Sequence, residues 1–166
     1  MKIKISSDST CDLGDELIQR YNVGIIPLSV ILGDKVHTDG VDITPQQIFD
    51  YVAATKTLPK TAACTEEEYA ERFKEYLKDC DCVIHFNISS KASVTNRNAT
   101  EAAKRFGKKV RVIDSLALST GQGLLVLKAC DLAAEGKSPD EIVDTVNALR
   151  PKVNTSFVPD SLEYLH

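Results

Sequence analysis

The feature that most constrains the fold of this chain is the alternation of short β-branched runs with segments that begin like helices. Three capping boxes, in which a Ser or Thr hydroxyl and a Glu or Gln side chain three residues later satisfy each other's backbone donors, predict helix starts at Thr44, Thr65 and Ser138. β-Branched runs predict strands at residues 3–6, 25–32, 83–88, 110–113 and 153–158. Such alternation is typical of a three-layer α/β fold, in which helices cover both faces of a mostly parallel sheet.

Glycines refine this arrangement. Gly33-Asp34, in the middle of residues 30–37, predicts a tight hairpin, so we expect one antiparallel edge strand on the otherwise parallel sheet. Two further glycines predict the C-terminal ends of helices that begin near Ser93 and near Ser119, namely Gly107 and Gly136.

The composition limits what the protein binds. A chain of 166 residues with 43% hydrophobic residues has the size and the core of one domain. Its 20 Lys and Arg against 24 Asp and Glu leave a net charge of −4, which excludes nucleic acid as the main partner because phosphates require a basic face. No apolar stretch is typical of a signal peptide or a membrane span, nothing indicates contact with a membrane surface, and the five cysteines are irregularly spaced. We therefore expect a cytoplasmic protein with reduced thiols.

The usual motifs of catalytic and cofactor chemistry are missing from the sequence. It contains no nucleophile elbow, no P-loop, no dinucleotide-binding glycine fingerprint and no HExxH helix, so we expect neither an enzyme nor a bound cofactor. Cys80, Cys82 and His85 are residue types that bind zinc, but alternation along a strand directs Cys82 and His85 to opposite faces. We therefore expect no metal site.

Polar residues follow the predicted strands at the end of the sheet where α/β proteins bind ligands. Residues 8–12 (DSTCD) form either a ligand-facing loop or a turn with Asp12 as a helix cap, and both interpretations stay open. Ser93 is predicted at a helix N-cap, where free N–H groups and the helix dipole favour an anion. Thr61 lies on a predicted loop before the capping box at Thr65, so helix capping does not explain it.

Several segments occur together in a specific order: residues 8–13 (DSTCDL), 59–61 (PKT), 88–93 (ISSKAS), 112–115 (VIDS) with 121–125 (GQGLL), and 157–165 (FVPDSLEYL). As a set they resemble the DegV family of bacterial fatty-acid-binding proteins. The resemblance implies a two-domain binder that holds the carboxylate of a long-chain, palmitate-like fatty acid with a threonine and a serine, which map onto Thr61 and Ser93. It also implies a partner, an ATP-dependent fatty acid kinase, to which the carrier presents the acid. Further candidates for ligand contact are Ser9, Ser90 and Gly121.

The resemblance also predicts domain boundaries. Residues 1–158 correspond to the family's N-terminal α/β domain. Residues 159–166 correspond to the start of a second domain, which we expect to be interrupted after these residues. The last segment is predicted to begin a helix without its covering domain, so we expect it to pack poorly or against a neighbouring chain.

Two other functions stay open from the sequence. An enzyme of phosphorylated or carboxylated metabolites would use residues 89–93 as an anion cradle and Asp8 or Asp114 as a base, and it predicts a polar pocket. The fatty-acid hypothesis instead predicts an apolar tunnel beside Thr61 and Ser93. The other possibility that stays open is that the chain folds but binds no ligand.

Overall fold

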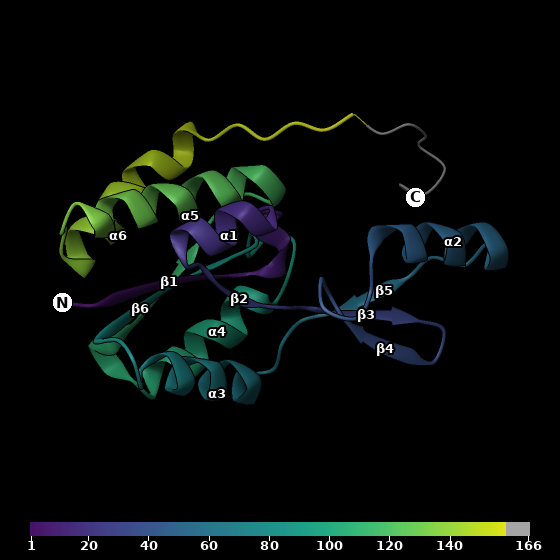
Figure 1. The fold of residues 1–166 in the computed structure, drawn as a ribbon, viewed down its shortest axis with the longest axis horizontal. Coiled ribbons are helices and arrows are strands. Elements are labelled where there is room, and N and C mark those ends of the chain that lie inside the picture. Colours follow the sequence, from purple (N-terminus) through teal and green to yellow (C-terminus); the bar gives the residue numbers. More distant parts are fainter. Residues whose placement is uncertain (159–166) are drawn as a thin grey trace.

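The structure, a computed structural model, describes residues 1–158 and contains a larger body and a smaller lobe (Figure 1). The body is built on a four-stranded sheet in which every neighbouring pair of strands is parallel. Its strands lie in the order β2 (Gly24–Ile26), β1 (Ile3–Asp8), β6 (Cys82–Asn87) and β7 (Val110–Asp114). Parallel neighbours require crossover connections, which explains why helices alternate with strands along the sequence.

Helices cover both faces of the parallel sheet (Figure 1). One face carries α1 (Asp15–Tyr21), α5 (Ser119–Ala134) and α6 (Pro139–Leu149), and the other carries α3 (Glu66–Tyr76) and α4 (Thr95–Lys104). The strand β6 is buried along its whole length because it lies between these layers. The predicted three-layer α/β fold with a mostly parallel sheet is therefore confirmed.

Alternation along β6 divides the core into two clusters. Cys82 packs in the cluster that contains side chains of α5 and α6. Val83 packs in the cluster of α3 and α4, and His85 lies on that same side, with its ring centroid 5.3 Å from that of Tyr69. Cys82 and His85 therefore face opposite layers, as their spacing predicts.

The predicted capping boxes are confirmed at the starts of α2 (Pro45–Thr55), α3 and α6. In each box the cap hydroxyl accepts a backbone N–H and the side chain three residues later accepts the N–H of the cap. Gly136 follows α5 with a φ of +79°, as a C-cap requires, whereas α4 ends at Lys104, before Gly107. Among the described helices, none has both the length and the apolar character needed to cross a membrane.

The lobe comprises residues 29–62 and contains α2 and a separate antiparallel sheet. Its strands lie in the order β4 (Lys35–Thr38), β3 (Ser29–Leu32) and β5 (Lys60–Ala62), and the hairpin at Gly33 is confirmed with a φ of +61°. The predicted antiparallel edge of the main sheet is wrong. The run 25–32 breaks at Pro27 because proline offers no N–H to a ladder, and the N–H of Leu28 donates to Ser9 Oγ at 3.2 Å instead.

Residues 153–158 form no strand, contrary to the prediction. They follow a short 3₁₀ turn at Arg150–Lys152 and run on without regular structure, with residues 154–158 exposed. β-Branched composition favours a strand only where a neighbouring strand and a packing surface exist, and the described part of the chain supplies no pairing here. The predicted helix start within residues 159–166 lies outside the described residues.

Candidate functional site

The loops that follow β6 and β7 meet at the carboxyl end of the parallel sheet. The N–H of Ser89 donates to the carbonyl of Ala117 at 2.9 Å, and the N–H of Ser115 donates to the carbonyl of Asn87 at 3.1 Å. These bonds tie the loop that carries Ser93 to the start of α5. This is the end of the sheet at which the sequence predicts a ligand.

Asp8, the last residue of β1, is fully buried and joins three elements through its carboxylate. Its Oδ1 accepts hydrogen bonds from Thr10 Oγ1 and from Gln122 Nε2, both at 2.6 Å. Its Oδ2 accepts from the backbone N–H of Ile88 at 2.8 Å and from Asn87 Nδ2 at 3.2 Å. All four contacts are donors, which is the arrangement that a buried carboxylate needs to offset its lost hydration.

A buried polar group extends from this carboxylate into the sheet. Asn87 Nδ2 lies 3.0 Å from the hydroxyl of Tyr69 and 3.1 Å from His85 Nε2, and Ser6 Oγ lies 2.9 Å from His85 Nδ1. Burial lowers the pKa of His85 from 6.5 to about 3, so the imidazole is neutral at physiological pH. Burial likewise raises the pKa of the Tyr69 hydroxyl above its usual value. These groups hold the interior together and present no charge to a ligand.

Ser93 lies one residue before the N-cap of α4 and not at the cap itself, which is Val94. Its hydroxyl nevertheless performs the capping function, because Oγ accepts the N–H of Thr95 at 3.2 Å and lies 2.6 Å from Thr95 Oγ1. The N–H of Ser93 donates to the carbonyl of Ser89 at 3.1 Å, which closes the turn before the helix. Ser93 is partly exposed, so its hydroxyl is accessible at a helix N-terminus.

Thr61 lies in β5 and not on the loop that the sequence predicts. It is exposed, and its strand partner is Val30 on β3. Thr61 belongs to the lobe while Ser93 belongs to the body. Asn98 on α4 donates from Nδ2 to the carbonyl of Cys64, in the segment between β5 and α3, at 2.9 Å. Along the chain, Thr61 lies a few residues before Cys64, and Ser93 lies a few residues before Asn98.

The further candidates have structural contacts that do not require a ligand. Ser9 Oγ accepts the N–H of Leu28 and so holds the segment between β2 and β3, which leads into the lobe, against the end of β1. Ser90 is exposed, and its N–H donates to Asp114 Oδ1 at 3.1 Å. Gly121 lies under the segment after α6, since a Cβ there would come within 2.0 Å of Thr155 Oγ1.

The two interpretations of residues 8–12 are both incomplete. Asp12 adopts a left-handed conformation with a φ of +49° and caps no helix N-terminus, because the N-cap of α1 is Gly14. The residue of this motif whose side chain joins several elements is the buried Asp8. Its partners Asn87 and Gln122 are polar residues in apolar surroundings, and that mismatch is the only signal of their role in the sequence.

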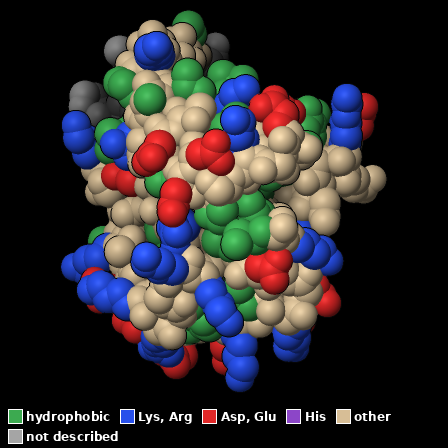
Figure 2. All heavy atoms as spheres, turned by 90° about the vertical axis from the view of Figure 1, so that its left-hand side faces the viewer, with side chains coloured by type: hydrophobic (Ala, Val, Ile, Leu, Met, Phe, Trp, Pro, Cys, Tyr) green, Lys and Arg blue, Asp and Glu red, His purple; other side chains and the backbone are tan. Residues whose placement is uncertain are grey.

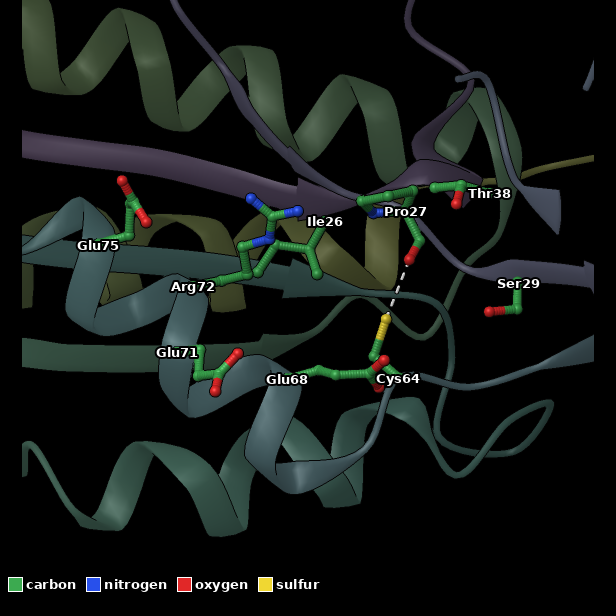
Figure 3. A pocket seen from close by; sticks show the side chains of 9 residues that line it. All are labelled: Ile26, Pro27, Ser29, Thr38, Cys64, Glu68, Glu71, Arg72 and Glu75. Atoms are coloured by element: carbon green, nitrogen blue, oxygen red, sulfur yellow. Dashed lines mark hydrogen bonds between the residues drawn. The ribbon is translucent and has the colours of Figure 1, made fainter. Parts of the chain in front are cut away.

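A cavity of about 290 Å³ lies where the lobe joins the body (Figure 3). The thiol of Cys64 donates to the carbonyl of Pro27 at 3.0 Å and so connects the two chain segments that join the lobe to the body. Burial raises the pKa of this thiol to about 11. One side of the cavity is formed by charged side chains of α3, namely Glu68, Glu71, Arg72 and Glu75. Such a lining does not suit an acyl chain, and neither Thr61 nor Ser93 contributes to it.

Large apolar side chains are exposed around the loop that carries Ser93. They include Val94, Leu116 and Leu118, which are 53%, 48% and 39% exposed. The opposite end of the molecule, seen from the left of Figure 1, carries Lys, Arg, Asp and Glu side chains around a central group of hydrophobic ones (Figure 2). Exposed apolar side chains therefore occur next to Ser93 at the carboxyl end of the sheet, as well as at the opposite end.

Comparison with known proteins places these features in context. Residues 2–166 match the model of a family described as "Uncharacterised protein, DegV family COG1307". A DegV domain-containing protein of Caldanaerobacter subterraneus subsp. tengcongensis is 37% identical over 166 residues, covering 99% of this chain, and one of Clostridium acetobutylicum is 37% identical over 165 residues, also covering 99%. The chain spans 59% of the length of each of these relatives.

Solved structures resemble the fold closely. A DegV family protein from Thermus thermophilus, described with fatty acid binding, is 36% identical with a TM-score of 0.86, over 91% of this chain and 54% of that one. A stearic acid-binding protein from Eubacterium ventriosum is 30% identical with a TM-score of 0.79, over 88% of this chain and 52% of that one.

Proposed function

The chain belongs to the DegV family, and we propose that residues 1–158 form the N-terminal α/β domain of a protein that binds a long-chain fatty acid by its carboxylate. The observation that carries this proposal is the likeness in fold and sequence to the Thermus thermophilus protein, which is described with fatty acid binding. The chain spans 59% of the length of the Caldanaerobacter relative, and our proposal assigns the remainder of the second domain to the part that it does not span.

Thr61 and Ser93 are the residues that we propose to bind the carboxylate. The hydroxyl of Ser93 already accepts the N–H of Thr95, so its own hydrogen is free to point to Thr95 Oγ1 or to an anion. The first turn of α4 adds partial positive charge at the same place. Thr61 is exposed on the lobe, and the proposal requires one anion to contact both its hydroxyl and that of Ser93 on the body.

The acyl chain supplies most of the affinity in this proposal. Burial of each methylene contributes about 0.8 kcal/mol, whereas each hydrogen bond to the carboxylate contributes roughly 1.5–3 kcal/mol. Our proposal places the start of the acyl chain on the exposed apolar side chains of Val94, Leu116 and Leu118. The carboxylate contacts therefore fix the orientation of the acid more than its total affinity.

The proposed protein performs no reaction on the acid. The alternative enzyme needs Asp8 or Asp114 as a base, but Asp8 is fully buried and accepts four hydrogen bonds. Asp114 Oδ1 accepts the N–H groups of Ser90 and Leu116, which fixes its carboxylate in a turn. We extend the proposal to a carrier role, in which a separate fatty acid kinase acts on the presented carboxylate.

The test is to extract the purified chain with organic solvent and to identify what copurifies by mass spectrometry. We expect a fatty acid of long chain length. Titration with palmitate and with the matching fatty alcohol then measures the contribution of the carboxylate, and the acid should bind more tightly by about tenfold or more. A phosphorylated metabolite in the extract would favour the enzyme instead, and equal binding of acid and alcohol would refute the carboxylate site.

A further inference from the structure

The loop that carries Ser93 starts at a bond to a buried carboxylate. Ile88 is the first residue after β6, and its N–H donates to Asp8 Oδ2 at 2.8 Å. The next residue, Ser89, accepts at its carbonyl the N–H groups of Ala92 and Ser93 at 2.9 and 3.1 Å. The position of the turn that ends at Ser93 therefore depends on where Asp8 holds Ile88.

The same carboxylate holds the other side of this loop. Asp8 Oδ1 accepts from Gln122 in the first turns of α5, and the chain just before α5 accepts the N–H of Ser89 at the carbonyl of Ala117. The loop thus lies between two segments that are both attached to one side chain. Asp8 is fully buried, so it takes no part in contact with a ligand.

We propose that Asp8 is a positioning residue for ligand binding, because its buried carboxylate sets the conformation of the loop that presents Ser93. This inference rests on the proposed function, in which Ser93 contacts the carboxylate of the acid. Asp8 acts through the backbone of Ile88, so the requirement is for an acceptor at the place of Oδ2 and not for a negative charge near the ligand.

The two oxygens of Asp8 give this proposal a specific signature. Ile88 donates with a backbone N–H, which cannot turn round, so an asparagine at position 8 will direct its oxygen there. Its NH₂ group will then face Thr10, whose hydroxyl is able to accept, and Gln122, whose side-chain amide is able to rotate. Asp8→Asn should therefore keep the loop in place, whereas Asp8→Ala removes the acceptor of the partly buried N–H of Ile88.

The experiment compares Asp8→Ala, Asp8→Asn and Thr10→Val in the full chain. Thr10→Val is the matched control, because it removes a bond to the same carboxylate on the oxygen that faces away from Ile88. Amide hydrogen exchange, followed by NMR in the absence of ligand, reports on the N–H groups of Ala92 and Ser93. Palmitate affinity is measured on the same samples.

We expect Asp8→Ala to speed exchange at Ala92 and Ser93 by tenfold or more and to weaken palmitate binding by about tenfold. Asp8→Asn and Thr10→Val should stay within about twofold of the parent on both readouts. If Asp8→Ala does not fold, Asp8→Ser, which keeps a polar group too short to reach Ile88, takes its place.

Unchanged exchange at Ala92 and Ser93 in the variant without the acceptor would overturn the proposal. A second combination of results would also overturn it: Asp8→Ala exchanges faster at Ala92 and Ser93 but binds palmitate as tightly as the parent, while Ser93→Ala binds it more weakly. The loop would then move without consequence for the ligand. A role of the charge itself would make Asp8→Asn as weak as Asp8→Ala, which also contradicts the inference. If the parent protein binds no palmitate, the proposed function has failed, and the exchange data alone decide whether Asp8 sets the loop.

Discussion

Removal of the two proposed carboxylate hydroxyls should separate ligand binding from stability. Ser93→Ala removes the acceptor of the Thr95 N–H, at 3.2 Å, and the contact with Thr95 Oγ1, at 2.6 Å. The loss of such a cap costs about 1 kcal/mol, which for a chain of this size lowers the Tm by about 2–4 °C. Thr61→Val keeps the β-branched shape that suits β5 and removes only an exposed hydroxyl, so the change in stability should stay within about 0.5 kcal/mol.

Both variants should lose affinity for a fatty acid by a similar factor. A hydrogen bond to a charged group contributes roughly 1.5–3 kcal/mol, which corresponds to about a tenfold to hundredfold weaker Kd. The assay is a titration with palmitate and with the fatty alcohol of the same length, together with thermal melts of each variant. Ser138→Ala is the matched control, because it removes a helix-capping hydroxyl at the start of α6, outside the proposed site.

One result would refute this reasoning. If Thr61→Val binds palmitate as tightly as the parent, the lobe does not supply the second hydroxyl and the bridging site is wrong. A loss of affinity for the alcohol equal to that for the acid would also contradict it, because the variants would then disturb the acyl chain and not the carboxylate.

Three further predictions concern stability. Burial lowers the pKa of His85 from its ordinary 6.5 to about 3. Between these two pH values, the unfolded chain therefore binds a proton at His85 that the folded chain does not bind. The free energy of unfolding should therefore decrease by up to about 1.4 kcal/mol per pH unit between about pH 6 and 3, and His85→Gln should flatten this slope in urea titrations. Gly123→Ala places a Cβ 2.7 Å from the backbone carbonyl oxygen of Cys11 and should cost about 1–3 kcal/mol in thermal melts, and an unchanged Tm would contradict this close approach. Ser138→Ala breaks both halves of a capping box and should cost about 1 kcal/mol, and an unchanged Tm would contradict that role.

Local features of the fold are the ones that the sequence predicts well. The capping boxes at Thr44, Thr65 and Ser138 are confirmed because both partners of each box lie within four residues, so no distant packing decides them. The parallel sheet follows from the alternation of strands and capped helices, since crossover connections leave few other topologies.

Features that depend on distant partners are predicted poorly. The run 25–32 has the composition of one strand, yet Pro27 divides it between two sheets, and the third strand of the second sheet is the short segment Lys60–Ala62. That segment has neither apolar alternation nor length, so its pairing with β3 is the only reason that it is a strand. Residues 153–158 show the converse, because strand-like composition without a pairing partner gives no strand.

The candidate site combines both cases. Ser93 is placed almost correctly by its position between a strand and a helix, while the contacts of Asp8 are missed because its partners lie 80 residues away at Ile88 and 114 residues away at Gln122. A polar motif after a strand predicts where a ligand binds, but it does not distinguish residues that face the ligand from those that hold the loops. Burial makes that distinction. An exposed hydroxyl such as that of Thr61 is available to an anion, whereas a carboxylate that is fully buried and accepts four hydrogen bonds does not reach a ligand, so our proposal gives Asp8 an effect on the ligand only through the backbone that it holds.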